Sequence, residues 1–247
     1  MTDTLLLRKG LCRQTADKAL RLIYPARCPV CDLPVKPFFA DICPECLPAL
    51  KPVTDPWCEK CGKKLETDTG ICSDCGRVKH YFVRNRSVFV YEGISASIYR
   101  FKYLGRREYA SLYADMTVRI LGGYIYRAEP DMIVPVPLSA ERELKRGYNQ
   151  ALDYAEGLSA ITDIPHSAYA LKRVKNTRPM KLLSPSERQN NLKNAFMADP
   201  NVVKSRCILL VDDIYTTGAT LDACSKVLLE AGALKVYGVT LASGAGI

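Results

Sequence analysis

The sequence has no long hydrophobic run. Its apolar stretches, such as residues 5–7 and 208–211, are too short to cross a bilayer, and the first ten residues contain no apolar segment of signal-peptide length. Compositional bias is absent as well. Hydrophobic residues make up 48% of the chain and charged residues 25%, which excludes collagen-like, coiled-coil and disordered classes. These absences predict a soluble, cytoplasmic protein of one or two domains.

Histidine is scarce, with two residues in 247, whereas cysteine is abundant, with eleven. Eight of the cysteines form Cys-x-x-Cys pairs within residues 28–75. A disulfide scaffold would need a secretory signal, which the sequence does not show, so the pattern indicates metal binding in a reducing compartment. The predicted metal ligands are Cys28, Cys31, Cys43, Cys46, Cys58, Cys61, Cys72 and Cys75.

The cysteine spacing fits zinc. One Cys-x-x-Cys turn supplies two thiolates of a tetrahedron and a second turn completes it, and a closed four-thiolate site is structural. We therefore expect two structural Zn²⁺ ions. The proline-containing residues 52–56 favour sequential pairing of the turns, although a cross-braced pairing also agrees with the spacing. Gly62 and Gly76 follow their cysteine pairs directly, where a zinc knuckle often needs a positive φ, and Asp32 occupies the matching place.

The chain divides into three predicted parts. Residues 1–26 have apolar positions on one helical face and predict an amphipathic helix. Residues 27–79 form a double zinc ribbon, which depends on metal because it is rich in proline and has little apolar periodicity. Residues 80–247 alternate strands and helices, which is typical of an α/β fold with a mostly parallel sheet flanked by helices. We expect strands at residues 87–91, 131–137, 207–211 and 235–241, and helices from residue 95 and over 108–122, 149–159 and 221–231.

The most specific string spans residues 208–220 and reads Ile-Leu-Leu-Val-Asp-Asp-Ile-Tyr-Thr-Thr-Gly-Ala-Thr. An apolar strand ends in Asp212 and Asp213, and a hydroxyl-rich turn leads into a helix. Backbone N–H groups at a helix N-terminus bind anions, and Gly218 allows a close approach of the backbone. Neither a Walker A loop nor a dinucleotide-binding glycine fingerprint is present. A capped helix with two solvated aspartates is the alternative interpretation.

Residues 211–220 resemble the phosphoribosyl pyrophosphate (PRPP) motif of type I phosphoribosyltransferases. Upstream of this motif come the cysteine-rich ribbon, Val134-Pro-Val-Pro137, Lys145-Arg-Gly-Tyr-Asn-Gln150 and Glu187-Arg188. In this order the motifs resemble the ComF (ComFC) competence family over essentially the whole length. The resemblance implies a type I phosphoribosyltransferase fold and a role in natural transformation, the uptake of DNA.

The resemblance also implies a site for PRPP or a related sugar phosphate together with Mg²⁺. Asp212 and Asp213 would hold the ribose hydroxyls. The loop for the 5′-phosphate would consist of Thr216, Thr217, Gly218, Ala219 and Thr220. The pyrophosphate side would consist of Pro135, Val136 and Pro137, with Arg142, Lys145 and Arg146 in a mobile hood and Lys102 as a weaker candidate. One residue departs from the family pattern: Met180 stands where a glutamine is usual, which leaves open how an acceptor would bind.

Two functions agree with these residues. In a Mg²⁺-dependent phosphoribosyltransferase, Mg²⁺ and the basic residues would stabilise departing pyrophosphate while an acceptor, which no residue identifies, attacks the ribose. A competence factor would instead bind single-stranded DNA and retain the phosphate site without catalysis. Basic stretches at residues 100–107, 142–146 and 172–193 and the neighbouring Tyr99 and Tyr103 suit that second function. The polar composition of residues 172–193 predicts a flexible loop. Partners in the competence machinery are implied by the resemblance alone.

Overall fold

The computed structural model describes residues 26–35, 41–175, 192 and 194–244. The chain forms two compact units, which divide between Leu50 and Lys51. The predicted amphipathic helix lies outside the described residues except for Ala26, and so does Met180. Unit 1 contains the short 3₁₀ helix η1 (Leu47–Ala49) and the first four of the predicted zinc ligands. The other four ligands lie in unit 2, so the two predicted zinc sites belong to different units.

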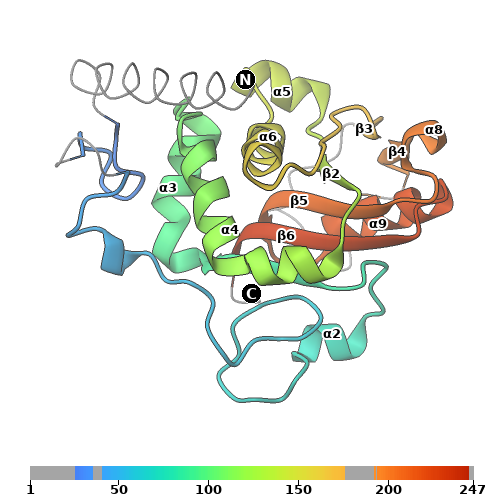
Figure 1. Cartoon of the computed structure of the whole chain (residues 1–247), viewed down its shortest axis with the longest axis horizontal. Helices are drawn as coiled ribbons and strands as arrows, with labels where there is room; N and C mark the ends of the chain where they lie inside the picture. The colour runs from blue at the N-terminus through green and yellow to red at the C-terminus, as the bar shows by residue number, and fades with distance from the viewer. Residues whose placement is uncertain (1–25, 36–40, 176–191, 193, 245–247) are drawn as a thin grey trace, which may run out of the picture. The chain divides into compact units, whose positions relative to one another are not determined.

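Unit 2 is built around a four-stranded parallel sheet (Figure 1). Across the sheet the strands follow the order β1 (Asn85–Val90), β6 (Lys235–Ser243), β5 (Cys207–Tyr215) and β2 (Met132–Pro135). Strand β5 pairs with β6 from Cys207 opposite Lys235 to Tyr215 opposite Ser243. Strand β2 and residues 207–211 of β5 are continuous apolar runs, because a parallel sheet is covered on both faces. The predicted α/β fold class is confirmed.

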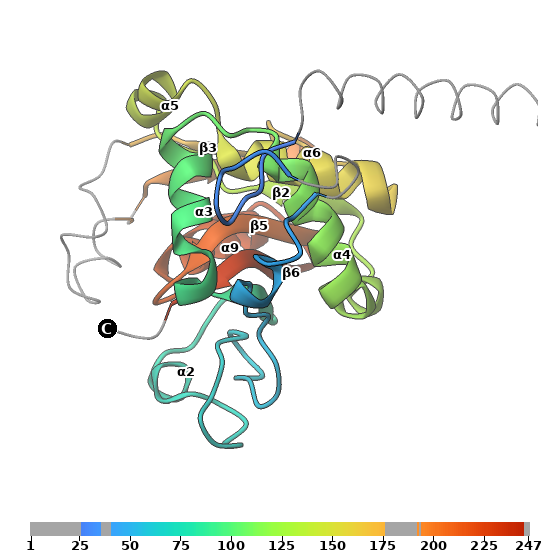
Figure 2. The same ribbon diagram turned by 90° about the vertical axis from the view of Figure 1, so that its left-hand side faces the viewer.

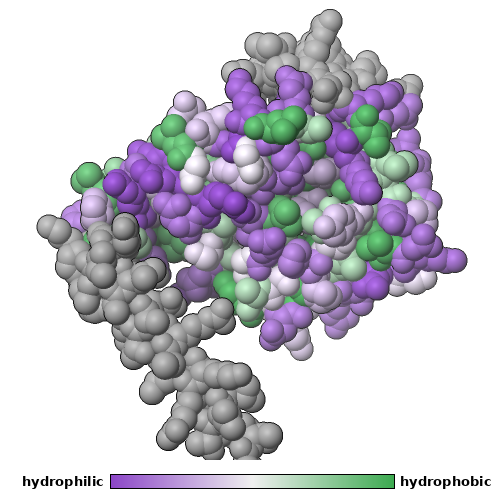
Figure 3. Space-filling view, turned by 90° about the horizontal axis from the view of Figure 1, so that it is seen from above, coloured by the Kyte–Doolittle hydropathy of each residue, from purple (hydrophilic) through white to green (hydrophobic). Residues whose placement is uncertain are grey.

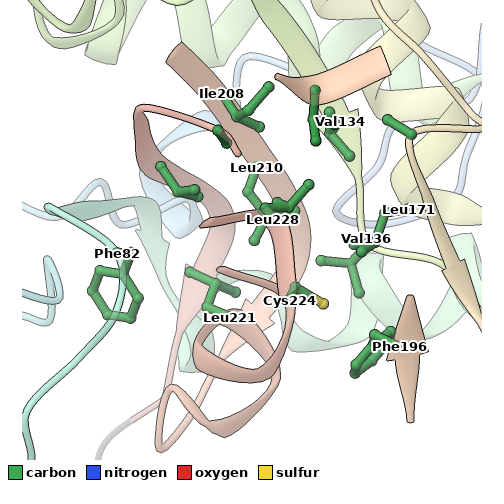
Figure 4. Packing of buried hydrophobic residues seen from close by; sticks show 14 of the residues in the cluster. Phe82, Val134, Val136, Leu171, Phe196, Ile208, Leu210, Leu221, Cys224 and Leu228 are labelled. Carbon is green, nitrogen blue, oxygen red and sulfur yellow. The ribbon is translucent and has the colours of Figure 1, made fainter. Parts of the chain in front are cut away.

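Helices cover both faces of this sheet. Helices α3 (Tyr91–Tyr103), α4 (Tyr109–Ala128) and α6 (Gln150–Thr162) pack on one face, and α9 (Ala219–Glu230) packs on the other (Figures 1 and 2). Successive side chains of a strand point to opposite faces. Accordingly, Ile208 and Leu210 of β5 lie in one buried cluster with Leu221 and Leu228 of α9 (Figure 4).

Several boundaries differ from those that the sequence predicts; helix α4, for example, ends at Ala128 instead of residue 122. Strand β5 continues to Tyr215 instead of ending at Val211, and α3 begins at Tyr91 instead of residue 95. Residues 172 and 173, the start of the predicted flexible loop, belong to strand β3 (Leu171–Arg173), which pairs antiparallel with β4 (Phe196–Ala198). Most of the remainder of that predicted loop lies outside the described residues. The smaller helices are α2 (Ser73–Arg77), α5 (Ala140–Arg146) and α8 (Pro200–Val203).

Hydrophilic side chains cover most of the face of the molecule seen in Figure 3, and the apolar residues there form small separate groups. Within the described ranges, none of the helices combines the length and the apolar character that crossing a membrane requires.

Candidate functional site

Each unit holds one cluster of four cysteines. The first cluster is Cys28, Cys31, Cys43 and Cys46, and the second cluster is Cys58, Cys61, Cys72 and Cys75; within each, the Sγ atoms lie within 4.8 Å of one another. Two of these separations are 3.9 Å, between Cys31 and Cys43, and 3.7 Å, between Cys61 and Cys72. Zn–S bonds of about 2.3 Å in a tetrahedron place thiolates about 3.8 Å apart, so both clusters fit structural zinc. The cysteines group as sequential pairing predicts.

Both clusters begin with the same backbone turn. Asp32 and Gly62, each directly after the first cysteine pair of its cluster, have positive φ angles of 62° and 73°, as the sequence predicts. The same prediction for Gly76 is wrong, because Gly76 lies inside helix α2. A helical turn brings residues three apart to the same side, so Cys72 and Cys75 meet without a left-handed residue.

The second cluster is bonded to the edge of the sheet. Asn85 at the start of β1 donates from Nδ2 to the Cys61 carbonyl at 2.8 Å, and its backbone N–H donates to the Lys60 carbonyl at 2.8 Å. Lys60 Nζ donates to the Phe82 carbonyl at 2.6 Å. Cys58 and Cys61 are fully buried in the same apolar cluster as Phe82. The second cluster is therefore part of the core of unit 2.

Residues 216–218, which connect β5 to α9, and the first two residues of α9, Ala219 and Thr220, together have the features of an anion site. Gly218 is the N-terminal cap of α9 with φ at 80°, and no side chain caps the helix, which leaves the first N–H groups available to a ligand. The hydroxyl oxygen of Thr217 is buried and has no hydrogen-bond partner among the residues that the structure describes. Residues 214–221 also line a small pocket. The predicted 5′-phosphate residues Thr216, Thr217, Gly218, Ala219 and Thr220 are all among the residues that line this pocket.

The two aspartates lie near the end of β5 rather than beyond it. Asp213 Oδ1 lies 2.8 Å from Lys102 Nζ of α3, and both side chains are less than a fifth exposed. The Asp212 carboxylate accepts the Asp213 N–H at 2.8 Å. Because neighbouring residues of a strand face opposite ways, Lys102 approaches Asp213 from the α3 face. The weakest of the sequence candidates, Lys102, therefore has direct contact with one of the acids.

The negative charge of Asp212 is poorly compensated in the folded protein. Burial, reinforced by the negative charge of Asp213, raises the pKa of Asp212 to about 7. The Asp213 N–H and the positive charges of Lys102 and Arg173 partly oppose this rise. A partly buried carboxylate with a raised pKa favours ligands that donate hydrogen bonds or bring positive charge.

The predicted pyrophosphate loop lies beside these acids. Pro135 pairs with Val211 across the sheet, and Val136 donates from its N–H to the Val211 carbonyl at 2.9 Å. Asn149, at the start of α6, donates from Nδ2 to the Val136 carbonyl at 3.2 Å. Pro137 follows directly. The loop is therefore held against β5, immediately before Asp212.

The three cations of the predicted hood lie on or at the end of helix α5. Arg146 Nη1 donates to Gln150 Oε1 at 2.7 Å, and its guanidinium lies 4.9 Å from the centre of the Tyr103 ring. Arg142 is close enough to Arg173 for its charge to lower the pKa of that guanidinium, after burial, which is the larger cause. Lys145 is exposed. The structure thus places Arg142 beside the site and turns Arg146 toward α3.

Two residues near the site are not among those that the sequence predicts. Arg173 of β3 adds a largely buried cation whose charge acts on Asp212. His80 lies between Cys75 of the second cluster and Asp222 of α9. Arg173 belongs to a basic run in which no feature distinguishes it, and the partner of His80 lies far along the chain, so local sequence signals find neither.

Comparisons with known proteins agree with this architecture. Residues 19–76 match the double zinc ribbon domain family. Competence protein F of Haemophilus influenzae is 34% identical over 200 residues, which cover 76% of this chain and 85% of that protein. The chain belongs to the ComF family of competence proteins. Competence protein ComFC of Bacillus subtilis is 33% identical over 77% of this chain and 79% of its own, and the DNA utilization protein YhgH of Escherichia coli K12 is 31% identical over 72% and 86%.

Solved phosphoribosyltransferase-type structures also match this ComF protein at low similarity. A glutamine PRPP amidotransferase from B. subtilis is 19% identical over 62% of this chain and 28% of that one, with a TM-score of 0.36. A purine phosphoribosyltransferase from Pyrococcus horikoshii is 21% identical over 53% and 73%, with a TM-score of 0.34. Both TM-scores are low. The α/β fold of this chain is established by its own parallel sheet and flanking helices.

Proposed function

We propose that this ComF protein binds PRPP or a related sugar phosphate, with Mg²⁺, at the carboxyl end of β5, and that it acts in the cytoplasm during DNA uptake. The observation that carries the proposal is the segment of residues 216–220: the start of α9 has no side-chain cap among the described residues, the buried Thr217 hydroxyl has no partner there, and both belong to residues that line one small pocket. Phosphate satisfies both, because it accepts several hydrogen bonds and its charge is favourable at a helix N-terminus.

Each of the remaining residues would contact a different part of the ligand. Asp212 and Asp213 would accept hydrogen bonds from the ribose hydroxyls. Lys102, which neutralises Asp213 in the structure, and Arg173 supply positive charge on either side of the acids for a pyrophosphate group. The backbone of the loop at residues 135–137 would line the same side. In this arrangement the phosphate would lie at the start of α9, the ribose at the end of β5, and the pyrophosphate on the side of β2.

Mg²⁺ prefers oxygen ligands, and the raised pKa of Asp212 marks a carboxylate that gains from a nearby cation. Asp212 and Asp213 are the side chains that would hold Mg²⁺ together with the oxygens of the ligand. When bound, the cation would neutralise charge on the pyrophosphate.

The test is titration calorimetry of PRPP into the zinc-loaded full chain, with and without Mg²⁺. We expect Mg²⁺-dependent binding that falls at least a hundredfold in an Asp212→Asn/Asp213→Asn variant, because each carboxylate contributes on the order of 1.5–3 kcal/mol as a charged hydrogen-bond acceptor. A matched control is Asp115→Asn, which removes an exposed carboxylate on α4. Absence of binding by the unaltered protein would contradict the proposal. If PRPP binds, an acceptor screen follows: release of pyrophosphate would identify a transferase, and binding without release would identify a binding protein.

A second candidate function is binding of single-stranded DNA on the adjacent surface. Tyr99 and Tyr103 of α3 are more than half exposed, their ring centres are 5.1 Å apart, and Arg146 lies over the Tyr103 ring. Exposed aromatic rings beside cations stack bases without sequence preference. The relatives named for competence and DNA utilization agree with this candidate.

Fluorescence anisotropy of a labelled oligothymidine tests this second function. We expect affinity to fall steeply with salt and to fall about tenfold or more in Tyr103→Ala, since stacking contributes about 1–3 kcal/mol per base. Tyr126→Ala on α4, where the side chain is 82% exposed, is the matched control. If Asp212→Asn/Asp213→Asn leaves DNA binding unchanged, the DNA surface and the phosphate site are separate. Equal loss in both tyrosine variants would contradict a stacking platform at Tyr103.

A further inference from the structure

The side chain of His80 connects the second cluster to helix α9, which begins within the proposed phosphate-binding segment of residues 216–220 (the phosphate loop). Its Nδ1 donates to Asp222 Oδ2 at 2.6 Å, and its Nε2 lies 3.4 Å from Cys75 Sγ. The His80 side chain is 1% exposed and the Asp222 side chain 14%. Polar contacts made away from water are stronger, and losing one partner leaves the other unpaired. One buried residue therefore joins a zinc ligand to α9.

Asp222 lies in the first turn of α9, directly after the phosphate loop. Its backbone N–H donates to the Gly218 carbonyl at 2.8 Å, and its Oδ1 accepts from the Tyr81 N–H at 2.9 Å. A Cβ atom on Gly218 would lie 2.5 Å from the Tyr215 hydroxyl and 3.2 Å from Cε1 of His80, so the imidazole packs directly on the loop. The contacts of His80 thus reach both the loop and the first turn of the helix.

Apolar packing follows the same line. The Phe82 ring stacks on His80 with ring centres 4.7 Å apart and meets Tyr215 edge-on at 6.3 Å. Phe82 and Tyr215 share their buried cluster with Cys58 and Cys61 of the second cluster. Closely packed interiors have few voids and transmit displacements. A change in the second cluster would therefore displace the residues against which the phosphate loop rests.

We propose that His80 positions the phosphate loop on the zinc-bound second cluster. With its thiolate fixed in the metal site, Cys75 holds the imidazole, and the imidazole holds Asp222 and with it the N–H groups at the start of α9. His80 is a positioning residue that does not touch the ligand. Loss of zinc from the second cluster then loosens an anion site to which no zinc ligand contributes. The effect on ligand affinity rests on the proposed function, whereas the effect on the loop does not.

Hydrogen exchange of the zinc-loaded full chain without ligand tests the positioning role directly. His80→Phe keeps a ring to stack on Phe82 but removes both polar contacts. We expect exchange of the amides of residues 215–222 to rise about tenfold or more in this variant, the factor that follows from losing one charged hydrogen bond. His80→Asn, which can still donate near the position of Nδ1, should restore most of the protection. His166→Phe, at the exposed second histidine of the chain, is the matched control and should leave the loop unchanged.

Two controls show whether a change in loop exchange comes from the loss of the His80 contacts: the zinc content of each variant and a second variant, Asp222→Asn. Each variant is assayed for zinc, and His80→Phe should retain two ions per chain. Unchanged exchange in a His80→Phe protein that holds both ions would overturn the proposal. If His80→Phe does not fold, Asp222→Asn carries the test, because it weakens the same contact from the other side; unchanged loop exchange in that variant would overturn the proposal equally.

Titration of PRPP with Mg²⁺ into the same variants separates the two proposals. We expect His80→Phe to bind about tenfold more weakly than the unaltered protein. If the unaltered protein does not bind PRPP while loop exchange still rises in His80→Phe, the proposed function fails and the positioning role holds. If PRPP binds equally well to both proteins and loop exchange is equal, the positioning role fails and the proposed function holds.

Discussion

The two cysteine clusters of this ComF protein share their motif and differ in their surroundings. In the first cluster 11 residues separate the cysteine pairs and in the second 10, and both begin with a left-handed residue after the first pair. The first cluster lies in unit 1, whereas the second lies in unit 2 with the four strands of the parallel sheet and shares the buried core of that unit. Ligand spacing thus determines the geometry of the metal site, and the neighbouring residues determine what the metal supports.

Removal of one buried cysteine ligand should have very different effects in the two clusters. Cys28 and Cys58 are both fully buried. We expect Cys58→Ala to lower the free energy of unfolding of unit 2 by on the order of 5 kcal/mol and to abolish PRPP binding, because structural zinc contributes folding free energy directly. Cys28→Ala should leave the unfolding midpoint of unit 2, followed by tyrosine near-ultraviolet circular dichroism, nearly unchanged. Equal losses of stability would refute the distinction between the clusters.

The left-handed positions Gly62 and Asp32 also distinguish the two clusters, and substitutions there keep every zinc ligand in place. A Cβ atom on Gly62 would lie 2.7 Å from the Cα of Arg86 and from the Asn85 carbonyl oxygen, so Gly62→Ala adds a clash to the left-handed strain. We expect a loss of about 3 kcal/mol in urea unfolding of the zinc-loaded protein. Asp32→Ala, at the matching place, already has a Cβ atom and should lose no more than about 1 kcal/mol. An Asp32→Ala variant as unstable as Gly62→Ala would contradict this account.

The stability of unit 2 should depend on pH, because the negative charge of Asp212 is unfavourable in the folded state. The folded-state pKa of Asp212 is raised to about 7, whereas an unfolded aspartate titrates near about 3.9. The folded state therefore binds more protons between these values, and stability due to Asp212 falls as pH rises from about 4 to about 7. Asp213, Lys102 and Arg173 are the charged neighbours that set this window.

Asp212→Asn removes that titration. We expect thermal unfolding at pH 8 to show a gain on the order of 2 kcal/mol for the variant, with little difference at pH 4, and calorimetry to show loss of PRPP binding. Asp115→Asn on α4 provides the control for an exposed carboxylate. A variant less stable than the unaltered protein at pH 8 would show that Asp212 is well compensated and would contradict the account.

The smallest expected difference concerns two ion pairs. Lys102 and Asp213 are 14% and 17% exposed, whereas Arg119 and Asp115 on α4 are 75% and 41% exposed. We expect Lys102→Met to cost about 1–3 kcal/mol of stability, because it leaves the Asp213 carboxylate without its cation, and Arg119→Met to cost less than about 0.5 kcal/mol. Differential scanning calorimetry measures both. Equal, small effects would indicate that Lys102 contributes no more than a surface charge.

The sequence predicts what is local and misses what is assembled from distant segments. Residues 212–220 alone predict the phosphate loop, because the strand end, the turn and the helix start are contiguous there. The cysteine spacing likewise predicts both metal sites. His80 and Arg173 escape prediction because their partners, Asp222 and Asp212, lie on other elements of the fold. Gly76 is mispredicted for the opposite reason: its local pattern matches a knuckle, but the chain forms a helical turn.

The most direct measurement is titration of PRPP with Mg²⁺ into the zinc-loaded protein and into the Cys28→Ala and His80→Phe variants, with loop exchange recorded on the same samples. The account predicts unaltered affinity and loop protection when the first cluster is broken, and weaker binding with faster exchange of residues 215–222 when His80 is replaced. Loss of binding in Cys28→Ala with unchanged behaviour in His80→Phe would contradict it.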